Sequence, residues 1–145
     1  MAEWGGMVAN IPDPEKTYTY DDWKTWEGRW ELIGGKAYNM TPAPSSRHQF
    51  VVGELYFALR RFFQNQRCFV FMAPFDVFLS EQGAYETPDD IVQPDIAVIC
   101  DQKQITDKGC FGPTALVVEV LSPSTALKDY SEKFYAYEHY RVNEY

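Results

Sequence analysis

Residues 115–121 read Ala115-Leu-Val-Val-Glu-Val-Leu121, a short apolar run with one acid, Glu119, near its centre. A run this short and this rich in Val and Leu is typical of a strand that is buried on both faces. An ionised carboxylate buried there without a partner would cost several kcal/mol, so Glu119 needs a partner or a raised pKa. If Glu119 stood alone, backbone donors or an arginine would be a sufficient explanation.

A second acid lies upstream, because Gln93-Pro-Asp95 opens the apolar run Ile96-Ala-Val-Ile-Cys100. Hard divalent cations bind carboxylate oxygens that are held on a fixed scaffold, so two acids on successive strands favour a metal site. Asp76 interrupts another apolar run, Val70–Leu79, and is a third candidate ligand. The alternative for Asp76 is a strand acid that points to solvent.

Length and composition predict one globular domain, which we place at residues 21–145 after an irregular arm at 1–20. A chain of 145 residues buries roughly two-thirds of its unfolded surface, and an aromatic content of 17% argues against disorder. No apolar stretch reaches the ~20 residues of a membrane span. The three cysteines, Cys68, Cys100 and Cys110, have neither the even count nor the close spacing of a disulfide or zinc framework. They predict a reduced, cytoplasmic protein.

The net charge of -8 bears on the partners of the chain. Proteins that bind nucleic acid usually carry a basic patch, since neutralised phosphates supply most of the non-specific affinity. The local concentration of basic residues is small and consists of Arg47, Arg60, Arg61 and Arg67. The charge argues against a constitutive, high-affinity DNA binder. It does not argue against a nuclease, because bound metal ions cancel the acids of their own site.

Periodicity and turn residues predict the order hairpin, helix, three strands, helix. The predicted elements are a short helix at 23–26, a hairpin at 30–40, a helix at 47–65, strands at 69–79, 92–100 and 115–121, and a helix from residue 129. The chain ends soon after the last helix. We therefore expect at least one further strand of the sheet to be missing from this chain.

This order, with Pro-Asp opening one strand and a glutamate inside the next, resembles the PD-(D/E)XK nuclease superfamily. Finer motifs resemble the Uma family of predicted endonucleases over roughly residues 27–145. These motifs are Trp30-Glu-Leu-Ile-Gly-Gly-Lys, His48-Gln, Ala73-Pro-Phe-Asp-Val, Gln93-Pro-Asp-Ile-Ala-Val, Val118-Glu-Val-Leu-Ser-Pro-Ser-Thr and Asp129-Tyr-Ser-Glu-Lys133, followed by Tyr137. The resemblance implies an α/β fold of the restriction-endonuclease-like kind, with a mixed sheet flanked by helices and an N-terminal hairpin.

The resemblance also implies an endonuclease that hydrolyses phosphodiester bonds in DNA with Mg²⁺ or Mn²⁺. Such hydrolysis uses a metal ion to hold the scissile phosphate and to activate a water molecule. Asp95 and Glu119 would be catalytic residues and metal ligands. The backbone carbonyl of Val120 would be a third ligand, and Asp76 would assist.

The lysine of the superfamily pattern follows the glutamate by two residues, where both side chains share a strand face. Leu121 occupies that position here. The family carries a lysine at the place of Lys133, which makes Lys133 the predicted substitute, although its spacing alone favours an ion pair with Asp129. Family motifs also make Glu31 and His48 supporting site residues. A half-exposed strand acid and a helix-capping imidazole are the commoner explanations for these two.

Two other classes of function stay open at this point. Leu121, the acidic charge and the missing strand suit a catalytically inactive binding or regulatory module of the same fold. The charge also suits a metal-dependent phosphohydrolase of small substrates. For the nuclease we expect DNA as substrate, no membrane contact and, by analogy with the superfamily, a homodimer.

Overall fold

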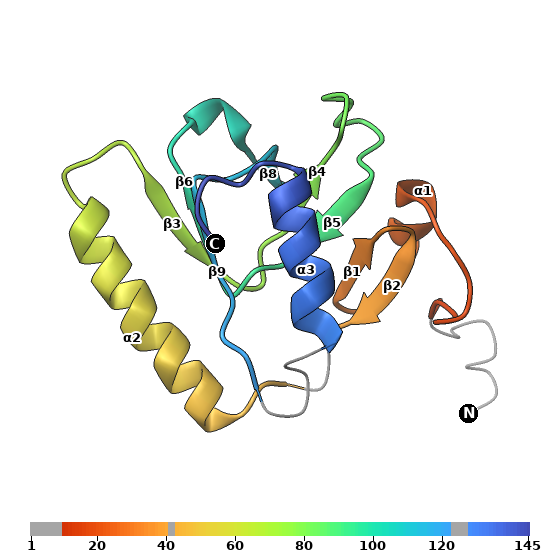
Figure 1. Cartoon of the computed structure of the whole chain (residues 1–145), viewed down its shortest axis with the longest axis horizontal. Helices are drawn as coiled ribbons and strands as arrows, with labels where there is room; N and C mark the ends of the chain where they lie inside the picture. Colours follow the sequence, from red (N-terminus) through yellow and green to blue (C-terminus); the bar gives the residue numbers. More distant parts are fainter. Residues whose placement is uncertain (1–9, 41–42, 123–127) are drawn as a thin grey trace.

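The structure, a computed structural model, describes residues 10–40, 43–122 and 128–145. Its helices are α1 (Tyr20–Trp23), α2 (Ser46–Phe63) and α3 (Lys128–His139), and a 3-10 turn, η2, spans Gln102–Gln104. Its strands are β1 (Trp30–Ile33), β2 (Lys36–Asn39), β3 (Phe69–Met72), β4 (Val77–Leu79), β5 (Asp90–Val92), β6 (Ile96–Ile99), β7 (Ile105–Thr106), β8 (Gly109–Phe111) and β9 (Leu116–Val118). Figure 1 shows α2 and α3 beside the strands.

The strands form two sheets. The larger has the order β2-β1-β5-β4-β8-β7, and the smaller has the order β3-β6-β9. β4 and β8 run parallel, while the other paired strands named above run antiparallel, so the larger sheet is mixed. The predicted hairpin forms β1 and β2 at one edge, and it turns at Gly34 and Gly35, whose positive φ angles suit glycine. The predicted class, a mixed sheet flanked by helices with an N-terminal hairpin, is confirmed.

Two of the three long strands that the sequence predicts are broken in the structure. The run 69–79 divides into β3 and β4, and the run 92–100 divides into β5 and β6, so each run crosses from one sheet to the other. Each crossing contains a proline, Pro74 or Pro94, which has no N–H to donate to a ladder. The crossings lie side by side, since the Ala73 N–H donates to the Asp95 carbonyl at 3.0 Å. The third prediction, 115–121, shortens to β9.

The predicted helix at 47–65 is α2, and it packs through a narrow stripe. Val52 is its buried residue, and Tyr56, Leu59 and Phe63 are partly buried against Val70, Ile96 and Val98 of the smaller sheet. Ser45 caps the helix by accepting a hydrogen bond from the His48 N–H at 3.1 Å. This cap fixes the direction of the first turn, where His48 lies.

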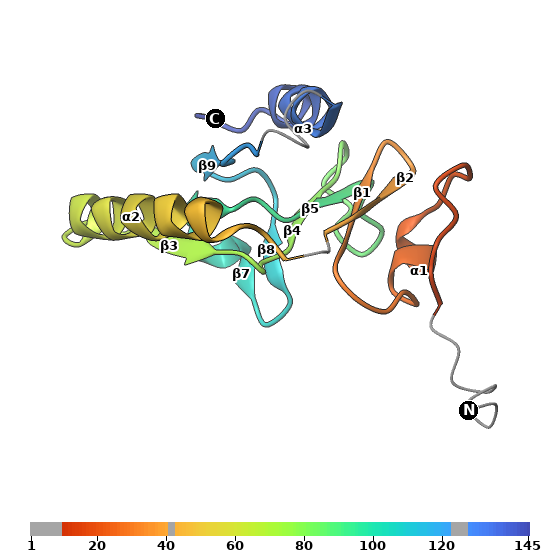
Figure 2. The same cartoon turned by 90° about the horizontal axis from the view of Figure 1, so that it is seen from below.

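The second long helix, α3, covers the other face of the smaller sheet (Figure 2). Ala136 and Tyr137 pack in a cluster with Ala97, Ile99 and Val117. Ala97 and Ile99 alternate along β6 with Ile96 and Val98, which contact α2. Successive side chains of a strand point to opposite faces, so β6 is buried between the two helices.

The N-terminal helix begins earlier than predicted. α1 runs from Tyr20 to Trp23, rather than over 23–26, because Thr19 and Asp22 form a capping box at its start. Trp23 and Tyr20 pack with Phe78 of β4 in a third apolar cluster. The predicted arm at 1–20 is described from residue 10, and the rest of it lies outside the described residues.

The prediction that the cysteines form no disulfide is wrong, because Cys68 and Cys100 are bonded. Phe69 of β3 lies opposite Ile99 of β6, so the next pair outward along these antiparallel strands is Cys68 and Cys100. Spacing along the chain does not reveal this pair, because strand register brings together residues that are 32 positions apart. Cys110 is free and buried.

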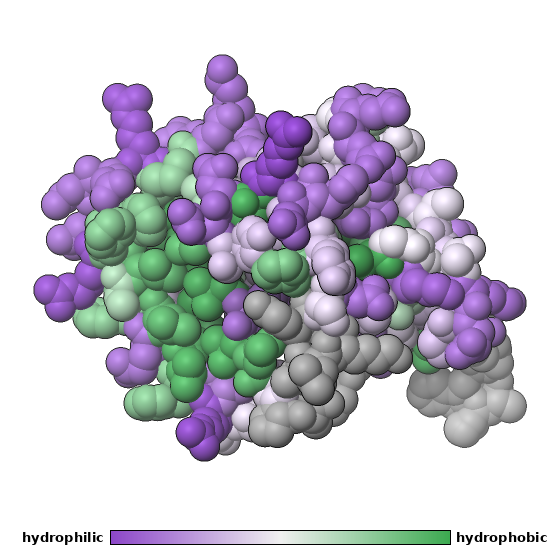
Figure 3. Space-filling view, viewed as in Figure 1, coloured by the Kyte–Doolittle hydropathy of each residue, from purple (hydrophilic) through white to green (hydrophobic). Residues whose placement is uncertain are grey.

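Apolar side chains are also exposed on the side of the molecule where α2 lies (Figure 3). The exposed large apolar residues of this helix are Phe50, Val51, Leu55, Phe57 and Phe62. Among the described residues, no helix is both long enough and apolar enough to cross a membrane.

Candidate functional site

Asp95 and Glu119 come from neighbouring strands of the smaller sheet. Asp95 directly precedes β6 and Glu119 directly follows β9. The strands are antiparallel with Ile96 opposite Val118, so the next position outward places Asp95 opposite Glu119. Residues opposite one another in such a pair project to the same face. Two acids from separate apolar runs therefore meet at one end of the sheet.

Asp95 is held by a backbone donor and by α2. Its Oδ2 accepts a hydrogen bond from the Val120 N–H at 2.7 Å, and the same oxygen lies 3.2 Å from Nε2 of His48. Both side chains are largely buried, with 12% of His48 and 19% of Asp95 exposed. The predicted supporting residue His48 therefore contacts the predicted ligand Asp95. The first turn of α2, which Ser45 caps, places His48 at this position.

Lys133 reaches the acids from α3. Its Nζ lies 2.7 Å from Oε2 of Glu119 and 2.6 Å from Oε2 of Glu31. Lys133 and Glu31 are buried, with 8% and 4% exposed. The alternative partner that the sequence offered, Asp129, has its side chain outside the described residues. Leu121, at the usual lysine position, is 49% exposed. The structure thus brings Glu31, Glu119 and Lys133 together.

Tyr137, which appears above only within the family motifs and without a role of its own, also contacts this group. Its hydroxyl donates a hydrogen bond to Oε2 of Glu119, and its ring is buried in the core beneath α3. Tyr137 follows Lys133 by four residues, so both side chains lie on one face of the helix. That spacing, next to a predicted site lysine, is the sequence signal that could have identified it.

Gln93 is a second contact that the sequence analysis did not single out. Its N–H donates to Oε2 of Glu31 at 2.7 Å, and its carbonyl accepts from Nζ of Lys133 at 3.4 Å. The side chain is also engaged, because Nε2 donates to Oδ1 of Asp76 at 2.7 Å and Oε1 accepts from Nε of Arg29 at 3.1 Å. Gln93 therefore connects Asp76 to the group formed by Glu31, Glu119 and Lys133, which we call the lysine group.

Asp76 lies beside a small hollow rather than in solvent. It directly precedes β4 and, with Gln93, lines a cavity of about 230 Å³ that the β7–β8 hairpin also borders. A side chain at Gly109 of this hairpin would place its Cβ 2.2 Å from the Asp76 carbonyl oxygen, which accepts from the Cys110 N–H. Glycine is therefore needed where the hairpin crosses Asp76. The elements predicted from the sequence leave residues 101–114 without a strand, so this hairpin was missed.

The charges of the buried group follow from its two carboxylates and one ammonium. Burial raises the pKa of Glu31 to about 7, against the attraction of Lys133, and the negative charge of Glu119 adds to the rise. Burial alone would lower the pKa of Lys133, but Glu119 and Glu31 together raise it. The raised pKa of Lys133 keeps it an ammonium at neutral pH, and the raised pKa of Glu31 means that this acid holds its proton to a higher pH than a free glutamic acid. Burial also raises the pKa of Asp76 and of Tyr137.

The donor chemistry of Asp95 and Glu119 fits one hard divalent ion. Protein donors engage Oδ2 of Asp95 and Oε2 of Glu119, and the described residues make no hydrogen bond to Oδ1 or Oε1. Mg²⁺ is commonly bound through one or two carboxylates, with water and phosphate oxygens as its other ligands. Over residues 10–40, 43–122 and 128–145, no three His, Cys, Asp or Glu side chains form a group that could hold a metal. The fit is to a two-carboxylate site and not to a cage of side chains.

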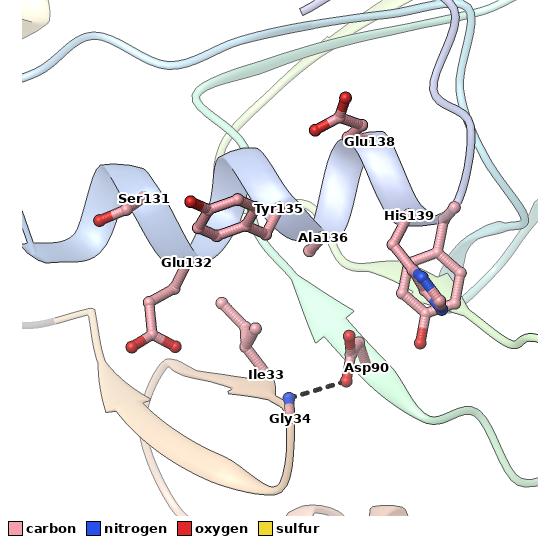
Figure 4. A pocket seen from close by; sticks show the side chains of 10 residues that line it. Ile33, Gly34, Asp90, Ser131, Glu132, Tyr135, Ala136, Glu138 and His139 are labelled. Carbon is pink, nitrogen blue, oxygen red and sulfur yellow. Dashed lines mark hydrogen bonds between the residues drawn. The ribbon is translucent and has the colours of Figure 1, made fainter.

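A larger hollow, of about 660 Å³, lies between α3 and the turn of the β1–β2 hairpin (Figure 4). Asp90 projects from β5 toward it and accepts a hydrogen bond from the Gly34 N–H at 3.0 Å. Burial raises the pKa of Asp90. Its lining from α3 includes Glu132, Tyr135 and Ala136. Asp95, Glu119 and Lys133 do not line this hollow, so it is separate from the lysine group.

Comparisons with known proteins give a family and a fold. A family model described as "Uma2: Putative restriction endonuclease" matches residues 17–145. The chain is also similar to a crystal structure described as a putative nuclease belonging to DUF820 from Anabaena variabilis, with 17% identity and a TM-score of 0.63. That likeness covers 81% of this chain and 66% of the solved one, and it shows a shared fold. No curated protein matches the chain.

Proposed function

Because the chain belongs to the Uma2 family, whose model is described as a putative restriction endonuclease, we propose that it is a metal-dependent endonuclease that hydrolyses phosphodiester bonds in DNA. The observation that carries the proposal is the position of Asp95 opposite Glu119, with Nζ of Lys133 2.7 Å from Oε2 of Glu119. Two carboxylates and one ammonium at the end of a sheet suit a metal ion and a bound phosphate.

Each residue has a role in this proposal. A bound Mg²⁺ or Mn²⁺ would polarise the scissile phosphate and lower the pKa of an attacking water. Asp95 and Glu119 would hold the ion, with the carbonyl of Val120 as a further ligand. Asp76, which the sequence predicts as an assisting ligand, instead accepts a hydrogen bond from the side chain of Gln93. Lys133 would stabilise the negative charge that develops on the phosphate.

The supporting residues orient these groups. His48 contacts Oδ2 of Asp95 and would fix the direction of that carboxylate, as outer hydrogen bonds do for metal ligands in general. Glu31 would keep Lys133 in place when Glu119 binds the ion, because Glu31 contacts the same Nζ. Tyr137 would hold Oε2 of Glu119.

Two alternatives remain to be separated from DNA cleavage. A catalytically inactive module is less favoured, because Lys133 brings an ammonium to the acids although Leu121 stands at the usual lysine position. A phosphohydrolase of small substrates is favoured by one observation, the net charge of -8, which repels a polyanion. Cleavage of bis-p-nitrophenyl phosphate without cleavage of DNA would select this second function.

The proposal includes a homodimer. The exposed apolar residues of α2, such as Leu55 and Phe62, would give it a surface. Light scattering of wild type and of Leu55→Glu tests this part. The cytoplasmic location stays a prediction, and the bond between Cys68 and Cys100 removes the cysteine argument for it.

Nicking of supercoiled plasmid tests the proposed activity. With Mg²⁺ or Mn²⁺ we expect wild type to nick the plasmid and EDTA to stop the reaction. Asp95→Asn and Glu119→Gln should lose at least ~100-fold in rate, because each removes a charged ligand. Glu86→Gln is the matched control, since it removes one exposed acid outside the group. Metal-independent nicking, or wild-type rates in Asp95→Asn, would contradict the proposal.

A further inference from the structure

Gln93 is a buried residue whose four polar groups all have partners. It is 6% exposed. Its main chain contacts the buried ion pair, through N–H to Glu31 and C=O to Lys133. Its side chain contacts residues from two other segments, Asp76 just before β4 and Arg29 just before β1. Gln93 therefore has one end on the ion pair and the other on Asp76 and Arg29.

The side chain of Gln93 supplies a restraint that the sheets do not supply. Residues 93–95 belong to no strand, because here the chain crosses from the larger sheet to the smaller one. Pro94 has no N–H to donate, and the backbone hydrogen bond that joins this segment to the neighbouring crossing is made by the carbonyl of Asp95 and not by Gln93. Hydrogen bonds of 2.7 Å to Asp76 and 3.1 Å from Arg29 hold the side chain instead. They set where the N–H and C=O of Gln93 meet the ion pair.

We infer that Gln93 is a positioning residue whose side chain, held between Asp76 and Arg29, keeps Glu31 and Lys133 in place beside Glu119. For catalysis the inference rests on the proposed function, whereas the positioning itself does not. It assigns Asp76 a role that differs from the predicted one. Asp76 acts through Gln93 and not as a metal ligand.

The contacts of Lys133 explain why the position of the Gln93 main chain matters. An ammonium has three N–H donors, and Nζ has three acceptors, on Glu119, Glu31 and Gln93. When Glu119 binds a metal ion, the acceptors on Glu31 and Gln93 remain. The N–H of Gln93 contacts Glu31 and its C=O contacts Lys133, so a shift of the Gln93 main chain would change both contacts together.

Gln93→Leu removes the side-chain hydrogen bonds and keeps the main chain. We expect kcat for plasmid nicking to fall about 10- to 100-fold, as for other residues that orient a reactive group, with little change in KM. The loss should vanish in a Lys133→Ala background, because Gln93 acts through Lys133. Equal losses in both backgrounds would show a merely structural role and overturn the inference.

A second measurement does not depend on activity. Acetic anhydride should label the buried Lys133 slowly in wild type and at least ~10-fold faster in Gln93→Leu, while the exposed Lys103 reacts equally in both. If wild type cleaves no DNA, the proposed function fails and this labelling still decides the inference. Unchanged labelling of Lys133 would overturn it.

Substitutions of Asp76 and Arg29 test the same contacts from their other end. Asp76→Asn keeps an acceptor oxygen for Gln93, so it should resemble wild type in labelling and in metal binding. Asp76→Leu and Arg29→Met should resemble Gln93→Leu, and they replace it if that variant does not fold. Loss of metal binding in Asp76→Asn would make Asp76 a ligand and overturn the inference.

Discussion

Lys133 lies between the buried carboxylate of Glu31 and the largely buried carboxylate of Glu119, and its positive charge offsets the repulsion between these two acids. Nζ is 2.6 Å from Glu31 and 2.7 Å from Glu119. The sequence predicted Lys133 through a family resemblance, while helical spacing alone favoured Asp129 as its partner. The partners of Lys133 come from tertiary contacts and not from helical spacing. Glu31 of β1 and Glu119, just after β9, lie against the face of α3 that carries Lys133.

Lys133→Met tests this electrostatic role. Without the ammonium, Glu31 and Glu119 are buried acids that repel each other, and breaking a buried pair costs about 3–5 kcal/mol. We expect urea unfolding at pH 8 to show a loss of this size. Lys103→Met, which removes an exposed lysine, is the control and should change stability by less than about 0.5 kcal/mol. A loss no larger than the control's would show that the pair is not buried as described.

Glu31→Gln should change how stability depends on pH. Burial raises the pKa of Glu31 from 4.5 to about 7 in the folded protein. The contribution of Glu31 to the free energy of unfolding is therefore fully present below pH 4.5, and it is lost as the pH rises through about 7. Wild type should lose on the order of 3 kcal/mol relative to Glu31→Gln across this window. Parallel curves of unfolding free energy against pH for the two proteins would contradict the raised pKa.

Gln93 and Tyr137 were not predicted as site residues, and each has a physical reason. The main-chain N–H and C=O of Gln93 make two of its four contacts, and main-chain groups carry no residue-specific signal. Tyr137 contributes a ring to the core and a hydroxyl to Glu119, so its apolar position in the helical pattern concealed the polar contact. Asp95 and Glu119 stood out because acids beside or inside apolar strands require an explanation, whereas Lys133 was predicted from the family resemblance alone.

At the level of elements, periodicity predicted the hairpin and both long helices but not the breaks between sheets. The runs 69–79 and 92–100 are apolar on both sides of their prolines, because residues before and after each crossing enter the core. An apolar pattern reports burial and does not report which sheet buries a residue. The crossings place Asp76, Gln93 and Asp95 where the two sheets meet.

The disulfide between β3 and β6 should stabilise the smaller sheet. Cys68 and Cys100 close a loop with a sequence separation of 32, for which chain entropy gives about 2–4 kcal/mol. Dithiothreitol should lower the unfolding free energy of wild type by this amount. The same reductant should leave a Cys68→Ser, Cys100→Ser double variant unchanged. If wild type is also insensitive to reductant, the two thiols are not bonded in solution.

Across the whole molecule, the concentration of arginines that the sequence shows is spread along α2 and does not form one patch. Arg47 lies at the start of α2, and Arg60 and Arg61 lie in its last turn. At 1.5 Å per residue these positions are roughly 20 Å apart. With a net charge of -8, the molecule offers phosphates little attraction beyond a metal ion and Lys133. Binding of DNA should therefore depend on the occupied metal site.

Calorimetric titration with Mn²⁺ or Mg²⁺ tests whether Asp95 and Glu119 bind one divalent ion, as we claim. We expect one ion per chain in wild type, no measurable binding in Asp95→Asn or Glu119→Gln, and wild-type binding in the control Glu86→Gln. A wild-type protein that binds no ion, or an Asp95→Asn variant that binds it as tightly as wild type, would contradict the claim.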